Sequence, residues 1–346
     1  MTTDLTIRGA GILGLSIAWE ALTRGARVTV IDPHGPGAGA SGGLVGALAP
    51  HVPENWNEKK AFQLASLLAA PRFWATVRDA SGQEPGYART GRLQPIADAD
   101  ALHRATARAE TAATLWGPAA TWRTEAATAA WSPVSPTGQV IRDTLSAHIH
   151  PARAVAALAA AITARGGHIA TEAPSRGSVI HATGTDGLAD LSTALGHPIG
   201  QPIKGQAALL AHDAANSPQL FADGLHVIPH LDGTTAIGST TERDYTDPTA
   251  TDAQLDTVIA RARAAVPALA RAPVIARWAG LRPRARSRAP LLGPWPGRPG
   301  HFVANGGFKI GFGMAPGIAA TMADLVLDGH DAIPREFHMD HILPWT

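Results

Sequence analysis

Four arginines stand at alternate positions in one short stretch, and arginine is a side chain well suited to holding an anion. They are Arg282, Arg284, Arg286 and Arg288. Alternate residues of an extended strand share a face, so we expect these four guanidinium groups to stand in one row. Because a guanidinium binds a carboxylate or a phosphate through two parallel hydrogen bonds, the row predicts either an anion site or a solvated face.

A second chemical signal is the pattern GAGILG, which places three glycines between an expected strand and an expected helix. In such a turn Gly9 allows the tight bend, Gly11 lets a pyrophosphate approach the backbone, and Gly14 lets helix and strand pack closely. The free N–H groups of the helix N-terminus favour phosphate. Asp32, at the end of the next expected strand, can accept hydrogen bonds from ribose hydroxyls. The pattern predicts a dinucleotide site, and by itself it fits NAD and FAD equally.

The loop after Asp32 favours FAD over NAD. An NAD dehydrogenase usually continues into its second mononucleotide half, whereas this chain continues into GPGAGASGGLVGALAPH. Backbone amides in a loop of such small residues can approach a second phosphate and a flat ring system. The loop also matches G-x-S-x-G around Ser41. A nucleophile elbow needs a strand directly before it, and residues 35–40 cannot form one, so a hydrolase is not expected.

The elements that would position these residues alternate between strands and helices in the first part of the chain. Strand–helix–strand units at the start and near 151–184 indicate a parallel sheet, and later segments indicate antiparallel hairpins inserted into it. We expect an α/β protein with a Rossmann-like FAD-binding domain and an inserted, mainly antiparallel α+β substrate domain. The FAD-binding domain is expected at 1–84, 142–200 and 279–346, and the substrate domain at 85–141 and 201–278. Helices are expected at 12–24, 58–80, 98–116, 151–165, 252–265 and 318–327, and an irregular segment at 121–137.

Composition restricts the function classes further. The chain has 346 residues, 45% of them hydrophobic and 16% charged, which is typical of a globular protein with more than one domain. A net charge of +1 offers no broad field for nucleic acid, and no cysteine is present for thiolate chemistry, disulfides or a thioether-linked cofactor. The histidines lack a ligand cluster, so no metal is expected. With no leader-like start and no long apolar run, we expect a cytoplasmic protein without a membrane span.

Several motifs together resemble the D-amino-acid oxidase superfamily of FAD enzymes, most closely the glycine oxidases. They are GAGILGLSIAWEALTRGARVTVID at the start, GALAPH after the Ser41 loop, PIKGQ at 202–206, RWAGLRP at 277–283 and GGFKIGFGMAPGIA at 306–319. The last two in this order are the more specific. The resemblance spans almost the whole chain and implies a non-covalent FAD.

The resemblance also implies which residues surround that cofactor. The first glycine turn would contact the pyrophosphate, the end of the second strand the adenosine ribose, the Ser41 loop the diphosphate and flavin, and the last glycine segment the isoalloxazine ring. The implied cofactor-binding residues are Gly9, Gly11, Ile12, Leu13, Gly14, Asp32, Pro33, Ala40, Ser41, Val45, Gly46, Ala47, Ala182, Thr183, Gly184, Gly307, Phe308, Lys309, Ile310, Gly311, Phe312 and Gly313.

For the substrate, the resemblance implies a carboxylate held by arginine. Arg282 matches the carboxylate-binding arginine of glycine oxidases, Arg284 is the second choice, and Lys309 replaces a further arginine. His51 and His226 are candidates for tuning the substrate amine; His226, or its neighbour Val227, stands where the family often has a tyrosine. Arg286 and Arg288 match no family role, and we expect them on a solvated face.

The implied reaction is oxidation of the C–N bond of a small amino acid such as glycine, sarcosine or a D-amino acid. Hydride passes to flavin N5, water hydrolyses the resulting imine to a 2-oxo acid, and oxygen or a quinone accepts the electrons. Two alternatives stay open. GASGGLVGALAPH and GSTTERDYTD also resemble the flavin domain of a bacterial tRNA wobble-uridine modification enzyme, in which the arginine row would meet RNA phosphates; the near-neutral charge disfavours it. The other is a non-catalytic FAD-binding protein.

Overall fold

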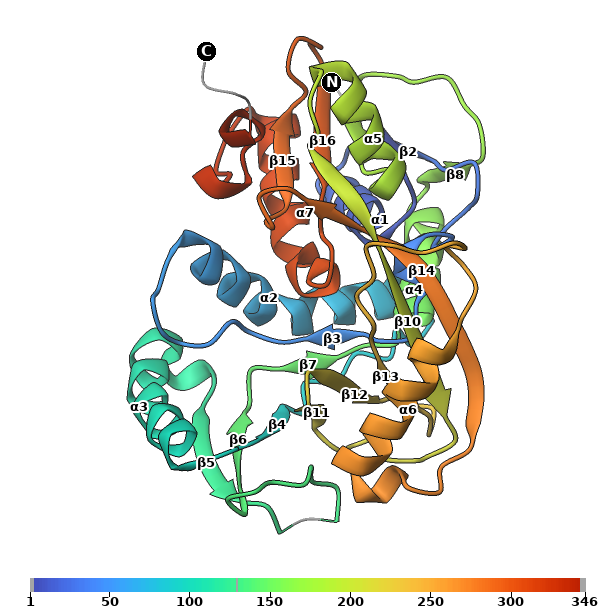
Figure 1. Ribbon diagram of the computed structural model, residues 1–346. Coiled ribbons are helices and arrows are strands. Elements are labelled where there is room, and N and C mark those ends of the chain that lie inside the picture. Colours follow the sequence, from blue (N-terminus) through green and yellow to red (C-terminus); the bar gives the residue numbers. More distant parts are fainter. Residues whose placement is uncertain (1–2, 129, 343–346) are drawn as a thin grey trace.

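A computed structural model describes residues 3–128 and 130–342, and two β-sheets organise it (Figure 1). The first sheet has six strands in the order β15-β16-β9-β1-β2-β8. All neighbouring pairs are parallel except β15 with β16. Its strands are β1 (Asp4–Arg8), β2 (Arg27–Ile31), β8 (His168–Ala170), β9 (Ser178–His181), β15 (Leu291–Pro294) and β16 (His301–Asn305).

Five helices belong with this first sheet. They are α1 (Ile12–Thr23), α2 (Glu58–Ser81), α4 (Pro151–Ala164), α5 (Gly184–Leu195) and α7 (Gly311–Asp328). Leu15, Ile17 and Ile318 are fully buried where α1 and α7 contribute to the largest apolar core. This parallel sheet with its helices is the Rossmann-like unit that the sequence predicts.

The second sheet has eight strands in the order β14-β10-β13-β12-β11-β4-β6-β5, and all neighbouring pairs but β11 with β4 are antiparallel. Helix α6 (Ala253–Ala265) covers part of it over a separate apolar core, and α3 (Ala99–Trp116) packs beside β5. The strands are β4 (Arg92–Pro95), β5 (Trp122–Ala126), β6 (Gln139–Asp143), β10 (Gly200–Leu210), β11 (Gln219–Ala222), β12 (Leu225–Pro229), β13 (Thr235–Gly238) and β14 (Val274–Ala285).

Smaller elements join the two sheets. β3 (Ala47–Leu48) pairs with β7 (Ala147–His148) between them, and a short 3₁₀ helix η1 (Ala40–Gly42) lies in the loop after β2. The remaining 3₁₀ turns are Gly117–Ala119, Pro267–Leu269, Arg335–Phe337 and Met339–Ile342. Strands β6 and β14 cross the expected domain boundaries at 142 and 279, so the division by residue number stays a prediction. No helix among residues 3–128 and 130–342 has the length and apolar character to cross a bilayer.

Two expectations about elements are wrong. The segment at 121–137, expected to be irregular, contains the edge strand β5, which forms because β6 pairs with it along its whole length. The closing helix begins at Gly311 rather than at 318. Its glycines and Pro316 lower helix propensity, but close packing compensates: a Cβ at Gly317 would lie 3.0 Å from both Phe62 and Ser66 of α2.

Candidate cofactor and substrate site

The first glycine turn is shaped by two close backbone approaches. Gly9 has φ +104°, and a Cβ added there would lie 2.3 Å from the carbonyl oxygen of Ala182. A Cβ on Gly14 would lie 2.0 Å from the carbonyl oxygen of Gly9. Only glycine fits at either position, because β1, β9 and α1 meet there. The contacts of Gly9 also place Ala182 and Thr183 beside the turn.

The N-terminus of α1 remains available to an anion. Its N-cap residue, Gly11, has no side chain to cap it, and a Cβ there would meet only the Ser41 hydroxyl, at 3.2 Å, among the described residues. That hydroxyl accepts a hydrogen bond from the Ile12 amide at 2.9 Å, which ties the Ser41 loop to the helix. Asp32 accepts hydrogen bonds from the Ala10 amide at 2.7 Å and the His34 amide at 3.0 Å. The carboxylate therefore holds the turn in place at the end of β2.

The second glycine segment lies against the first. A Cβ on Gly307 would be 3.6 Å from Leu13, and one on Gly311 would be 3.4 Å from Ile12. Helix α7 begins there, and no described side chain caps its N-terminus either. Phe308 adopts φ +42° directly before it. Two helix N-termini with free amides thus adjoin one glycine-lined region, and this donor set fits the phosphates and anionic ring edge of a flavin dinucleotide.

A cavity of about 220 Å³ lies between the N-terminus of α7 and the second sheet. It contains three of the five residues that the sequence places at the substrate: His51, His226 and Lys309. No lining residue carries a carboxylate. The lining residues are Ala47, Ala49, Pro50, His51, Gln63, Arg92, Phe221, His226, Lys309, Ile310 and Gly313. Val227, the other residue considered for the tyrosine position, is buried in the core of the second sheet.

Three side chains of this cavity, His51, His226 and Lys309, have pKa values shifted toward their neutral forms. Burial, with the nearby charges of Arg92 and Lys309, lowers the pKa of His226 to about 3, and its Nδ1 is buried without a partner among the described residues. Burial also lowers the pKa of His51, whose backbone amide donates to Gln63 at 2.8 Å. Partial removal from water, together with Arg282 and Arg284, lowers the pKa of Lys309 to about 8. Near neutral pH the two histidines are therefore uncharged and the lysine is charged.

Arg282 lies beside this cavity without lining it. Its Nη1 donates to Ser239 Oγ at 2.8 Å, and its Nη2 donates to the carbonyl oxygens of Thr240 at 2.6 Å and Lys204 at 3.4 Å. The side chain crosses Gly205 of the neighbouring strand, where a Cβ would lie 1.8 Å from Nη2. Its Nε is buried and makes no hydrogen bond within the described part of the chain. Burial lowers the pKa of this arginine to about 10, although the charge of Glu242 opposes the shift.

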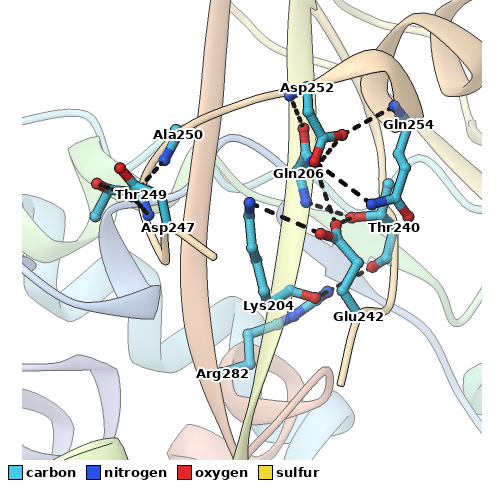
Figure 2. A network of polar contacts seen from close by, with 10 residues as sticks. All are labelled: Lys204, Gln206, Thr240, Glu242, Asp247, Thr249, Ala250, Asp252, Gln254 and Arg282. Atoms are coloured by element: carbon cyan, nitrogen blue, oxygen red, sulfur yellow. Dashed lines mark hydrogen bonds and ion pairs between the residues drawn. The ribbon is translucent and has the colours of Figure 1, made fainter. Parts of the chain in front are cut away.

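A buried polar network holds these contacts in place (Figure 2). Lys204 Nζ lies 3.7 Å from Glu242 Oε2, and both side chains are almost fully buried. Gln206 donates from Nε2 to Glu242 at 3.1 Å and to Asp252 at 2.9 Å. The Thr240 hydroxyl donates to Glu242 as well. The buried Glu242 carboxylate thus pairs with Lys204, and its charge also favours the charged form of Arg282.

The four-arginine row is only half formed. β14 ends at Ala285, so Arg282 and Arg284 are in the strand, while Arg286 lies in a turn and Arg288 has φ +59°. The Arg286 amide still bonds Ile199, in register with β10, and the turn then forms as the Arg288 amide bonds the Ala285 carbonyl. Arg284 and Arg282 both lie over the Phe308 ring, with Cζ 5.7 Å and 5.6 Å from its centroid. Arg286 and Arg288 are exposed and, with Arg243 and Arg284, line a separate open cavity of about 270 Å³.

Comparison with known proteins identifies the family. Residues 4–325 match the family model described as "FAD dependent oxidoreductase". The chain belongs to this family. The expectation of FAD is thereby confirmed.

The oxidoreductase is similar to several glycine oxidases. That of Geobacillus kaustophilus is 25% identical over 93% of this chain and 92% of its own length. That of Pseudomonas aeruginosa is 37% identical, but the match spans only 36% of this chain and 35% of the relative. The crystal structure of the Geobacillus enzyme superimposes with a TM-score of 0.83 over 98% of this chain and 99% of that one, at 22% identity. The crystal structure of an iminodiacetate oxidase from Chelativorans sp. BNC1 superimposes with a TM-score of 0.84 over 96% of this chain and 98% of that one, at 21% identity. The expected fold class is confirmed.

Sequence reasoning missed Arg92. This arginine of β4 lines the cavity beside His226 and is only 6% exposed. No motif surrounds it, and a single arginine in a short strand usually faces solvent. The buried Asp143 that pairs with it lies 51 residues further along the chain. The pairing becomes visible only in the folded sheet.

Proposed function

We propose that this oxidoreductase oxidises the C–N bond of a small amino acid of the glycine, sarcosine or D-amino-acid type, yielding an imine that water hydrolyses to a 2-oxo acid. The observation that carries the proposal is the cavity beside the N-terminus of α7, which offers a cation and two uncharged histidines and no carboxylate. Family membership and similarity to glycine oxidases along the chain support it. Bound FAD supplies the acceptor for the two electrons of the oxidation.

In this proposal the protein binds the carboxylate and leaves the amine uncharged. Arg282 is the first candidate for the carboxylate: its Nε lacks a partner, and burial of its charge makes an anion beside it favourable. Lys309 is the second candidate, because its charge lies at the cavity wall. Arg284 adds a further positive charge beside both candidates, because its guanidinium lies over the same Phe308 ring. His226 and His51 place no positive charge beside the amine, which favours its reactive neutral form.

The cofactor contacts expected from the glycine turns, the Ser41 loop and residues 182–184 are part of the same proposal, because their geometry fits a dinucleotide. Reoxidation by oxygen or a quinone and a cytoplasmic location also belong to it. The near-neutral net charge continues to disfavour a large RNA footprint.

A substrate screen tests the proposal directly. The purified yellow protein is mixed anaerobically with glycine, sarcosine, D-alanine and D-proline, and the flavin absorbance is followed. We expect at least one compound to bleach the flavin within seconds, and readmitted oxygen to restore it with release of peroxide if oxygen is the acceptor. Restoration only by a quinone would identify the other acceptor. A flavin that none of these amines bleaches would favour the non-catalytic alternative.

The charge of Lys309 predicts a pH dependence of carboxylate binding. Below pH 8 the ammonium is protonated and attracts an anion, and the attraction is lost as the pH rises through about 8. We expect the Ki of acetate, which does not titrate in this range, to rise about tenfold between pH 7 and 9.5. Lys309→Arg keeps its charge and should give a flat profile, whereas Lys309→Met should bind weakly throughout. Parallel profiles for wild type and Lys309→Arg would exclude the lysine from the site.

A further inference from the structure

The cavity contains a second cation that the proposed function does not use. Arg92 projects from β4 into the wall that also contains Phe221 and His226. It is one of the few charged residues buried in the second sheet, with 6% of its surface exposed. Burying a guanidinium costs several kcal/mol unless its donors are satisfied, so this placement calls for a partner on each side.

On one side the partner is Asp143, the residue directly opposite in β6. Arg92 Nε donates to Asp143 Oδ2 at 3.1 Å, and the other carboxylate oxygen accepts from the Ser146 amide at 2.7 Å. Asp143 is fully buried, so the aspartate cannot turn away. The pair therefore fixes the direction of the arginine side chain.

On the other side, N–H groups of the Arg92 guanidinium remain available to a ligand. Within residues 3–128 and 130–342, Nη1 and Nη2 make no hydrogen bond. Because Nε is held by Asp143, the free end of the guanidinium is the Nη1–Nη2 edge, a fork that matches the two oxygens of a carboxylate. The cavity that Arg92 lines provides no such carboxylate from the protein.

The cavity also separates two positive charges on different elements. Arg92 comes from the second sheet and Lys309 from the segment before α7. Both act on His226, which lies on the same cavity. The free Nη1–Nη2 edge of Arg92 and the ammonium of Lys309 thus border one cavity of about 220 Å³, a volume that suits only a small molecule.

We propose that Arg92 binds a second carboxylate, so that the preferred substrate is an amino dicarboxylate whose other carboxylate is held near Lys309 and Arg282. The inference rests on the proposed oxidation of an amino acid and names the class of that amino acid. A purely structural Arg92–Asp143 pair would instead leave the protein indifferent to a second carboxylate.

Binding of unreactive analogues tests this separately from catalysis. Glutarate has the skeleton of iminodiacetate with CH₂ in place of NH, and butyrate is glutarate with one carboxylate replaced by a hydrogen atom. We expect the flavin spectrum of the holoenzyme to report a Kd for glutarate at least about thirtyfold lower than that for butyrate. Equal Kd values for the two acids in the wild type would overturn the proposal.

Variants then assign the preference to Arg92. In Arg92→Met the ratio of the two Kd values should fall to within about threefold of one. Because that change leaves Asp143 buried and unpaired, the double variant Arg92→Met/Asp143→Leu provides a folded alternative with the same expected ratio. Arg123→Met, an exposed arginine of the same sheet, is the matched control and should keep the wild-type ratio. A preference for glutarate that persists without Arg92 would contradict the assignment.

Turnover distinguishes failure of this inference from failure of the proposed function. Wild-type kcat/KM should be higher for iminodiacetate than for sarcosine, and higher for D-aspartate than for D-alanine. If sarcosine and D-alanine are oxidised as well as or better than their dicarboxylate counterparts, the inference fails and the proposed function stands. If glutarate binds selectively but no amine is oxidised, the Arg92 site stands and the proposed function fails.

Discussion

Gly14→Ala is expected to yield protein that has lost most of its FAD. The added methyl would lie 2.0 Å from the carbonyl oxygen of Gly9, and because that oxygen belongs to the backbone, α1 must move away from β1. Overpacking of this kind costs about 3 kcal/mol when nothing flexible can give way. The shift also displaces the N-terminus of α1 that the pyrophosphate would use. The flavin-to-protein absorbance ratio after dialysis and the urea midpoint measure the two effects.

Gly39→Ala is the matched control for this change. Gly39 belongs to the neighbouring loop, has φ −90°, and a Cβ there meets no protein atom within 4 Å. We expect this variant to keep the wild-type absorbance ratio and midpoint. Retention of FAD and of the wild-type midpoint by Gly14→Ala would show that the helix does not pack as described.

Arg282→Met is expected to raise the KM for an amino acid substrate by about 100-fold, which corresponds to about 2.8 kcal/mol of lost binding, while the protein stays yellow. The methionine covers similar apolar surface but has no donor for a carboxylate. Loss of the guanidinium also leaves Ser239 Oγ and the Thr240 carbonyl without this donor. Flavin content and the thermal midpoint of unfolding are therefore measured beside the kinetics. Arg282→Lys keeps the positive charge but lacks the two parallel N–H donors of a guanidinium. This variant should therefore keep only part of the wild-type affinity for the carboxylate.

Arg277→Met separates this effect from a general loss of positive charge. Arg277 stands on the same strand, is partly exposed, and pairs with Asp256 at 2.5 Å. Removing an exposed ion pair changes stability by less than about 1 kcal/mol, and the KM should stay at its wild-type value. If Arg282→Met leaves the KM unchanged, the carboxylate is held elsewhere, and Lys309 and Arg92 are the cations that line the cavity.

Local patterns predict the first glycine turn and the elements around it well. The turn around Gly9 and Gly14, the helix it begins and the strand ending before Asp32 are encoded within about thirty residues, and each signal has a direct backbone cause. The second glycine segment is predicted as a flavin neighbour from the family resemblance. Its contact with Ile12 and Leu13 brings the two ends of the chain together as expected.

The substrate end depends on contacts that no short pattern contains. The extent of β14 depends on its pairing with β10, far earlier in the chain, and the turn that follows Ala285 breaks the arginine row. Arg92 becomes buried because Asp143 pairs with it across the sheet. The orientation of Arg282 follows from its bonds to Ser239 and Thr240, in the loop after β13, about forty residues earlier in the chain. Which residues line the site, and which only lie near it, is therefore decided by pairing between residues far apart in the chain.

The absence of a side chain at Gly205 makes positions 205 and 282 of this chain depend on one another. The Arg282 guanidinium occupies the volume that any side chain at 205 would need, since a Cβ there would lie 1.8 Å from Nη2. Even alanine at 205 would push the arginine out of this position, so a side chain at 205 requires a change at 282 as well. In a set of aligned relatives, arginine at 282 should accordingly occur only together with glycine at 205.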